Sequence, residues 1–155
     1  MLPKTLSLTP STRGRYGAWL QADHLVSGSA EKTKMGTALF VSAVYGDSQT
    51  SLFPFYAKIG FVRQGTFSTR TVDSVSFAFA YGQFNPRLHG IESELSARGF
   101  AVPRANAEQL VEVDYGVQAF PWLTVRPNVQ YVIEPSGDAR NRNAIVLGLN
   151  TSVRL

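Results

Sequence analysis

The side chains that could support catalysis in this 155-residue chain are few: two histidines, eleven acidic residues and no cysteine. The absence of cysteine excludes disulfides, thiolate zinc sites and cysteine nucleophiles. His24 and His89 lie at or beyond the ends of expected strands. The chain contains no G-x-S-x-G elbow, no H-E-x-x-H motif and no phosphate-binding G-x-x-x-x-G-K-[ST] loop. The sequence therefore predicts no catalytic residue, no metal and no cofactor, and we expect that the protein is not an enzyme.

A second group of polar side chains recurs at alternate positions in the C-terminal part and could contact a hydrophilic solute. Hydrogen-bonding and charged groups of this kind suit a surface that water can wet. Arg126, Gln130, Glu112 and Asp114 rank first because they lie in the middle of their segments. The alternative, that each side chain only solvates the wet side of a sheet, stays open for every one. The whole group comprises Glu112, Asp114, Gln118, Arg126, Asn128, Gln130, Asn150, Ser152 and Arg154.

Seven segments of period two must position these side chains, each about ten residues long and bounded by Gly, Pro, Asp, Asn or Ser. They cover residues 14–23, 35–46, 52–65, 73–84, 108–120, 122–134 and 143–155. The fifth shows the pattern clearly, because Val111, Val113, Tyr115 and Val117 alternate with polar residues and glycine. The first two segments are ambiguous, since Trp19, Phe40 and Val44 fall on the less apolar face. The sequence predicts an all-β, antiparallel fold in a single domain.

The connections differ in length from one to the next. Residues 119–122 form a tight turn, residues 134–143 form a longer polar loop, and residues 85–107 form the longest loop. Loops beyond about 12–15 residues are uncommon unless they carry structure or function. We expect a short helix over residues 91–98, within a loop that lies outside the cell. An inward-folded plug and an external ligand loop are the alternatives for this segment.

Alternation alone cannot say whether the apolar face meets a protein core or lipid. A soluble barrel places it inside, whereas a membrane barrel reverses the arrangement. Membrane strands need about 9–11 residues, whereas strands of soluble proteins average about 5–6. Aromatic residues gather near segment ends, as in an interfacial girdle, and long and short connections interleave. These features favour an outer-membrane barrel, with a soluble β-barrel that binds a small molecule as the alternative.

The C-terminal segments resemble the OprB-type carbohydrate-selective porins of Gram-negative bacteria. The hairpin YGVQAFPWLTVRPNVQYVIEPSG and the strand NAIVLGLNTSV carry the closest likeness, in Pro121, Trp122, Thr124, Gln130 and Tyr131 among others. The stretch from Leu52 to Phe84 and the opening GRYGAWLQ also fit the family. The resemblance implies passive diffusion of sugars through a water-filled barrel in the outer membrane. It also implies contact with outer-membrane lipid and a homo-trimer.

The chain departs from the family pattern in two respects. Outer-membrane barrels usually finish on an aromatic residue that the assembly machinery reads, and here the last residue is Leu155. A porin of this kind has roughly 16 strands, and this chain supplies about seven. With no apolar leader segment at Met1, residues 1–155 are expected to be the C-terminal part of a porin barrel. We expect an open sheet that does not form a pore by itself.

The charge of the chain gives no indication of a nucleic-acid partner. The formal net charge is +4 and the pI is near 9.6, but the basic residues are dispersed along the sequence. Nucleic-acid binding normally shows a basic patch with stacking aromatic residues. Three hypotheses remain after these considerations: a section of a sugar porin, a soluble binding barrel, and a β-rich hydrolase that uses His24 or His89.

Overall fold

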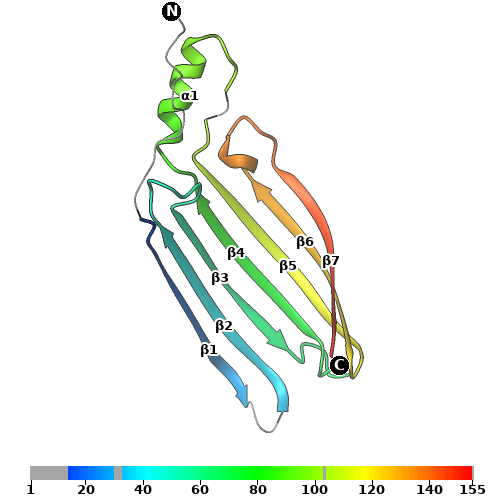
Figure 1. Ribbon diagram of the computed structural model, residues 1–155. Coiled ribbons are helices and arrows are strands. Elements are labelled where there is room, and N and C mark those ends of the chain that lie inside the picture. The colour runs from blue at the N-terminus through cyan, green and yellow to red at the C-terminus, as the bar shows by residue number, and fades with distance from the viewer. Residues whose placement is uncertain (1–13, 30–32, 103, 155) are drawn as a thin grey trace, which may run out of the picture.

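The computed structural model describes residues 14–29, 33–102 and 104–154 and places seven strands in one antiparallel sheet. Strands that are consecutive in sequence are neighbours in the sheet, in the order β1-β2-β3-β4-β5-β6-β7 (Figure 1). A helix, α1, lies between β4 and β5, and a short 3₁₀ helix, η1, lies between β6 and β7. The strands are β1 (Gly17–Ser29), β2 (Thr33–Gly46), β3 (Phe55–Gln64), β4 (Ser74–Gln83), β5 (Ala107–Phe120), β6 (Leu123–Ile133) and β7 (Ala144–Val153); the helices are α1 (Leu88–Ala97) and η1 (Pro135–Gly137).

Each of the seven expected segments overlaps one strand, so the period-two prediction is confirmed. The largest difference is in β1, which runs to Ser29 rather than ending at residue 23. Its partner β2 is 14 residues long and continues the ladder beyond the clean alternation. The register shifts between Leu25 and Ser27 and again between Gly28 and Ser29. These irregularities disturb the alternation of apolar and polar residues, which is why the pattern alone ended the strand early.

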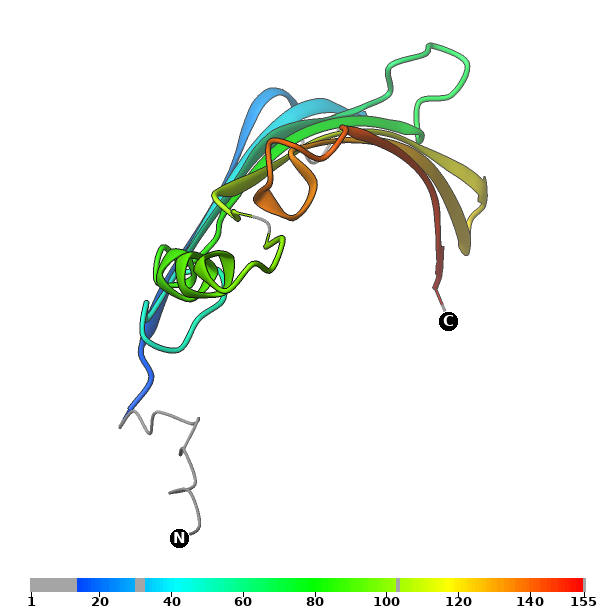
Figure 2. The same cartoon turned by 90° about the horizontal axis from the view of Figure 1, so that it is seen from above.

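The sheet curves into an open arc (Figure 2). Both α1 and η1 lie on the inner side of the arc, which we call the concave face. Within the described residues, β1 pairs only with β2, and β7 pairs only with β6, so the sheet has two free edges. An open antiparallel sheet was the expected fold, and its curvature is that of a section of barrel wall.

The two ends of the sheet are built differently. One end carries residues 47–54, 84–106 and 134–143, among them the two longest connections, and we call it the loop end. The opposite end, the turn end, carries residues 65–73 and the two-residue connection of Pro121 and Trp122. In Figure 1 the loop end is at the top and β7 finishes at the bottom. The two longest connections lie at the loop end, as expected, but residues 65–73 at the turn end are one residue longer than residues 47–54, so long and short connections interleave only in the C-terminal half.

Burial is inverted relative to a water-soluble sandwich. Among the described residues, the buried hydrophobic side chains are only Ala78 and Ala80, whereas Asp114 and Asn128 are each 7% exposed. The apolar face of β7 is open, and Leu147 is 78% exposed. On a curved sheet, side chains crowd together on the concave face and spread apart on the convex face. The polar face is therefore the concave one, which is opposite to what the soluble binding barrel requires.

Helix α1 begins at Leu88, three residues before the expected start. Asn85 and Pro86 precede it, and the Asn85 side-chain oxygen accepts a hydrogen bond of 3.0 Å from the backbone N–H of Arg87. An Asn followed by Pro is a helix-start signal that could have been read from the sequence. In the part of the chain that the structure describes, no helix has the length and apolar character that crossing a membrane requires.

Candidate pore-lining face

The strand register brings the predicted polar residues of β5 and β6 together on the concave face. Glu112 lies opposite Gln130, and Asp114 lies opposite Asn128. Glu108 shares the face of Glu112, and its carboxylate accepts a 2.7 Å hydrogen bond from the backbone N–H of Ser136. Ser136 belongs to η1, which lies inside the arc (Figure 2). This contact fixes the direction of the alternating polar residues: they point into the arc.

Hydrogen bonds link these side chains across three strands. The Gln130 amide donates to Glu112, and the Ser76 hydroxyl donates to Asp114. The Arg126 guanidinium forms an ion pair with Asp114, with its Nε 3.5 Å from the carboxylate Oδ1. Ser76 was missed by the sequence argument, although its position in the alternation of β4 gives the same face. The result is a wall of hydrogen-bonding groups held by one another rather than by a core.

Two oxygens of this wall have no hydrogen-bond donor among the described residues: Oδ1 of Asp114 and Oδ1 of Asn128. Both side chains are more than nine-tenths buried by their neighbours. Buried polar atoms are normally paired. The Asp114 Oδ1 faces the Arg126 guanidinium at 3.5 Å, and the Asn128 Oδ1 is packed against Gly148.

Glycines make room for large side chains of the neighbouring strand. A Cβ added to Gly148 of β7 would lie 2.5 Å from the Asn128 Oδ1, and one on Gly60 of β3 would lie 2.5 Å from the Phe40 Cζ. Glycine inside a strand often marks such a close approach. These glycines therefore let Asn128 and Phe40 lie flat along the wall, which keeps the interior of the arc open.

The ambiguous faces of the first two segments are resolved by the register. Trp19 lies opposite Val44, which in turn lies opposite Tyr56, so these residues share the concave face. Phe40 lies opposite Gly60 on the same face, and the Lys58 ammonium is 5.7 Å from the centre of the Phe40 ring. Aromatic rings and a cation thus lie inside the arc beside the polar groups. The concave face therefore combines apolar ring surface with hydrogen-bonding groups.

The remaining predicted residues lie toward β7 and the turn end. Arg126 and Asn150 are opposite each other and line a shallow depression together with Thr124, Thr151 and Ser152. Gln118 donates its side-chain amide to the carbonyl oxygens of Phe120 and Pro121 at the turn. Arg154 follows the last residue of β7, and its N–H donates to the Trp122 carbonyl at 2.8 Å. Gln118 and Arg154 therefore lie at the rim, whereas Glu112, Asp114, Asn128 and Gln130 lie on the wall.

A buried carboxylate fastens the turn end. Asp73 is 1% exposed and precedes β4. It accepts hydrogen bonds from the Arg70 guanidinium, from the Tyr115 hydroxyl at 2.7 Å and from the Gln118 backbone N–H at 3.0 Å. The Arg70 guanidinium, followed by these other donors, lowers the pKa of Asp73 from 3.8 to about 2 against the opposing effect of burial. Asp73 thereby ties the β3–β4 connection to β5.

The loop end is connected through backbone hydrogen bonds. The Phe84 N–H donates to the Asn106 carbonyl at 2.8 Å, and the Asn106 N–H donates to the Gly137 carbonyl at the same distance. The Asn85 side-chain amide donates to the Ser51 carbonyl at 2.9 Å, which joins the loop between β2 and β3. All three connections of the loop end are thus held together where the concave face opens.

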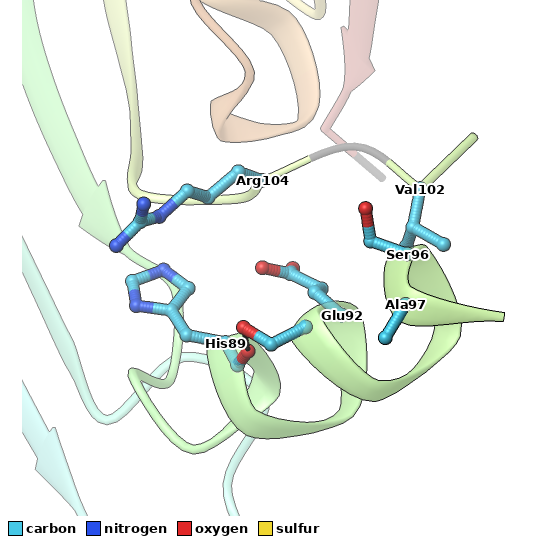
Figure 3. Close-up of a pocket in the computed structure, with 7 residues that line it drawn as sticks. His89, Glu92, Ser96, Ala97, Val102 and Arg104 are labelled. Carbon is cyan, nitrogen blue, oxygen red and sulfur yellow. Dashed lines mark hydrogen bonds between the residues drawn. The ribbon is translucent and has the colours of Figure 1, made fainter. Parts of the chain in front are cut away.

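The longest loop forms a small pocket between α1 and the residues Val102 and Arg104 (Figure 3). His89 lies 2.9 Å from the Ala105 carbonyl through its Nε2, and the Glu92 carboxylate accepts a 3.2 Å hydrogen bond from the Ala105 N–H. Arg104 extends toward the His89 ring (Figure 3). Because His89 and Glu92 hold the loop backbone, their role is to brace the loop against α1. Within residues 14–29, 33–102 and 104–154 no cluster of three or more His, Cys, Asp or Glu side chains could hold a metal.

A curved antiparallel sheet with an apolar convex face and a hydrogen-bonding concave face is a section of outer-membrane β-barrel wall. The description "Carbohydrate-selective porin, OprB family" matches residues 2–155, and the chain belongs to this family of Gram-negative outer-membrane porins. Porins are transport proteins and not enzymes.

Solved structures and curated relatives agree with this assignment. The high-pH structure of Pseudomonas putida OprB superposes with a TM-score of 0.83 at 29% identity, over 90% of this chain and 35% of that one. The low-pH structure of the same protein gives a TM-score of 0.63 at 25% identity. Porin B of Pseudomonas aeruginosa is 28% identical over 149 residues, and the putative porin QuiX of Acinetobacter baylyi is 25% identical over 146. The chain spans about one third of these relatives, with 32% of Porin B and 33% of QuiX covered.

Proposed function

We propose that this chain forms part of the wall of a water-filled outer-membrane pore through which carbohydrates diffuse. The observation that supports the proposal best is the concave face, where Glu112, Gln130, Asp114 and Ser76 form hydrogen bonds across three strands. Selectivity in such a pore comes from its diameter and from the groups that line it, and no catalytic group is needed. Sugars are therefore the solutes we assign to the pore, by the chemistry of this face and by family membership.

In this proposal the lining residues are Glu112, Asp114, Asn128 and Gln130 on the wall, Arg126 and Asn150 beside them, and Gln118 and Arg154 at the rim. Trp19, Phe40 and Lys58 add aromatic and cationic surface opposite the polar strands. The convex face contacts lipid, through side chains such as Ile145, Leu147 and Leu149. The homo-trimer implied by the family resemblance would cover part of that same convex face.

We also propose that the whole chain is one section of a single barrel domain, with the loop end outside the cell. Outer-membrane barrels have short periplasmic turns and longer extracellular loops. Residues 85–107, which carry α1, are then an extracellular loop. Leu155 shares the parity of Leu147 and Leu149 in the sequence and would face lipid with them, but it lies outside the described residues.

Single-cysteine labelling tests the two faces directly, because the chain has no cysteine of its own. Gln130→Cys and Asn150→Cys place a thiol on the concave face, and their neighbours Val129→Cys and Leu149→Cys place one on the convex face. In outer-membrane vesicles, a charged methanethiosulfonate reagent should label the first pair at least tenfold faster than the second. The neighbouring positions serve as matched controls, since they share strand, depth and expression.

Equal labelling of all four positions would refute the pore-wall assignment. So would a protein that stays monomeric in buffer without detergent and melts cooperatively, because this behaviour belongs to the soluble binding barrel. Liposome swelling in isotonic glucose, compared with a larger oligosaccharide, then measures whether the assembled pore passes sugars. Sedimentation in detergent measures whether three copies assemble.

A further inference from the structure

The charged side chains of the concave face are unevenly distributed between its two ends. Toward the turn end, Asp114 is the last carboxylate among the described strand residues of this face. Beyond it lie Arg126 on β6 and Arg154 after β7. The half nearer the loop end holds one cation, Lys58, and its ammonium faces the Phe40 ring. The carboxylates of the face are Asp23, Glu108, Glu112 and Asp114.

Asp114 holds the Arg126 guanidinium through one nitrogen only. The Nε of Arg126 lies 3.5 Å from Oδ1 of Asp114, while Oδ2 of the same carboxylate accepts a hydrogen bond from the Ser76 hydroxyl. A Cβ added to Gly116 would lie 3.2 Å from the Arg126 Nη2, so the guanidinium packs over a residue that leaves room for it. Among the described residues neither Nη group has a hydrogen-bond acceptor, and the Arg126 side chain is 40% exposed. A guanidinium held in place therefore keeps two free donor groups inside the arc.

Arg126 lines the shallow depression between β6 and β7, which has a volume of about 350 Å³. Thr124 and Ser152 lie opposite each other and add two hydroxyl groups, and Asn150, opposite Arg126, adds a side-chain amide. None of the residues that line the depression carries a carboxylate. Sites for small molecules have volumes of roughly 300–1,000 Å³ and a few convergent polar groups. The depression therefore has room for one small polar solute.

The donors of this depression suit an oxyanion. A guanidinium presents its N–H groups in one plane, and this fork matches the two oxygens of a carboxylate. The hydroxyl and amide groups around it can bond the hydroxyl groups of a sugar. Because Asp114 offsets part of the positive charge, the site balances one negative charge better than the roughly two charges of a phosphate group.

We propose that the turn half of the concave face binds the carboxylate of a sugar acid, with the Nη groups of Arg126 as donors. The inference rests on the proposed function of the pore and adds a class of solute to it, anionic monosaccharides beside neutral ones. Asp114 is a positioning residue in this proposal, because it orients the guanidinium and does not contact the solute.

The local charge can be measured with thiol reagents of opposite sign, since the chain has no cysteine. Ser152→Cys places a thiol in the depression, and Val146→Cys is its matched control on the same strand and face, nearer the loop end. In outer-membrane vesicles, the ratio of labelling rates for an anionic and a cationic methanethiosulfonate should be about fivefold higher at Ser152→Cys. Equal ratios at the two positions would overturn the proposal.

Removal of the Arg126 charge tests whether this residue is responsible. Arg126→Gln should lower the ratio at Ser152→Cys about threefold, whereas Arg142→Gln, on the exposed surface of the loop end, should leave it unchanged. If Arg126→Gln loses the circular dichroism of the parent, Thr124→Asp replaces it, because an added carboxylate in the depression should lower the ratio in the same way. An unchanged ratio in the folded variant would overturn the proposal.

Protection from labelling identifies the solute. Gluconate should slow the labelling of Ser152→Cys at concentrations where glucose and glucose 6-phosphate do not, and added salt should abolish this protection. Asp114→Asn separates orientation from charge: it should weaken protection by gluconate without lowering the reagent ratio, and unchanged protection would refute the positioning role. Equal protection by glucose, or stronger protection by the phosphate, would overturn the inference and leave the sugar pore standing. Equal labelling of the concave and convex faces would instead refute the pore.

Discussion

Replacing Asp73 by Asn tests whether this buried carboxylate fastens the turn end of the sheet. Asp73 accepts hydrogen bonds from Arg70, Tyr115 and Gln118, so one side chain joins the β3–β4 connection to β5. Asp73→Asn keeps the shape and removes the charge that these donors stabilise. A pKa lowered from 3.8 to about 2 corresponds to roughly 2 kcal/mol of folding free energy if the whole shift counts. Because the Arg70 side chain is 46% exposed and partly screened, we expect a loss of about 1 to 2 kcal/mol at neutral pH.

The pH dependence has a definite sign. The pKa of Asp73 is lower in the folded chain, so its stabilisation is complete above the unfolded value of 3.8 and is lost as the pH falls toward about 2. Wild type and Asp73→Asn should therefore differ most at pH 5 to 7 and converge at about pH 2. Urea unfolding of the full chain in detergent micelles, followed by circular dichroism, measures both quantities.

Glu94→Gln provides a matched control, because it removes one carboxylate from the exposed surface of α1. Its unfolding free energy should stay within about 0.5 kcal/mol of wild type. The reasoning fails if Asp73→Asn behaves like this control at pH 7. It also fails if the difference between Asp73→Asn and wild type is the same at pH 2 as at pH 7, because the loss would then not come from the ionised carboxylate.

Three further predictions concern the packing within the sheet, the longest loop and the convex face. Gly60→Val should lower the free energy of unfolding in urea by about 1–3 kcal/mol, because the added Cβ would overlap the Phe77 carbonyl oxygen. Gly90→Ala, whose Cβ would meet open space, should leave the free energy of unfolding unchanged, and equal losses in the two variants would contradict the close packing at Gly60. Arg140→Ala removes hydrogen bonds to Asp138 and to the Val102 carbonyl, so chymotrypsin should cleave the loop at Phe100 several-fold faster. An unchanged cleavage rate would show that Arg140 does not hold this loop in place. In lipid vesicles Leu147→Arg on the convex face should lower the free energy of unfolding by about 2–4 kcal/mol, whereas Val146→Arg on the concave face should lower it much less. A larger loss for Val146→Arg than for Leu147→Arg would mean that the two faces are assigned the wrong way round.

Much of the wall could be predicted from alternation because the period of a strand is fixed by the backbone. In β5, Val111, Val113 and Glu112 have the faces that their parity predicts, and the register confirms that Glu112 lies opposite Gln130. Alternation left the faces of β1 and β2 ambiguous, because Trp19 and Phe40 lie on the concave face, which is otherwise mostly polar. The face of each residue in those two strands can be assigned only from the strand register, which runs through β2 to β3.

The helix in the longest loop shows a second limit of prediction from the sequence. Its presence was expected from the sequence, and its start at Leu88 follows the Asn85-Pro86 signal, but the sequence does not show that the Asn85 side chain also reaches the Ser51 carbonyl. Contacts such as these join segments far apart in the chain. Local propensity contains no information about them.

The sequence by itself determined that the chain is a set of amphipathic strands of membrane-spanning length, because side-chain alternation and the spacing of turns are local properties of the chain. It also placed Glu112, Asp114, Asn128 and Gln130 on one face. Only the tertiary structure decided which neighbours those side chains meet, such as Ser76 beside Asp114, and that Asp73 joins the β3–β4 connection to β5. Pairing depends on register, and register is set by all the strands together. The common direction of the two free edges likewise emerges only when the seven strands are assembled in order.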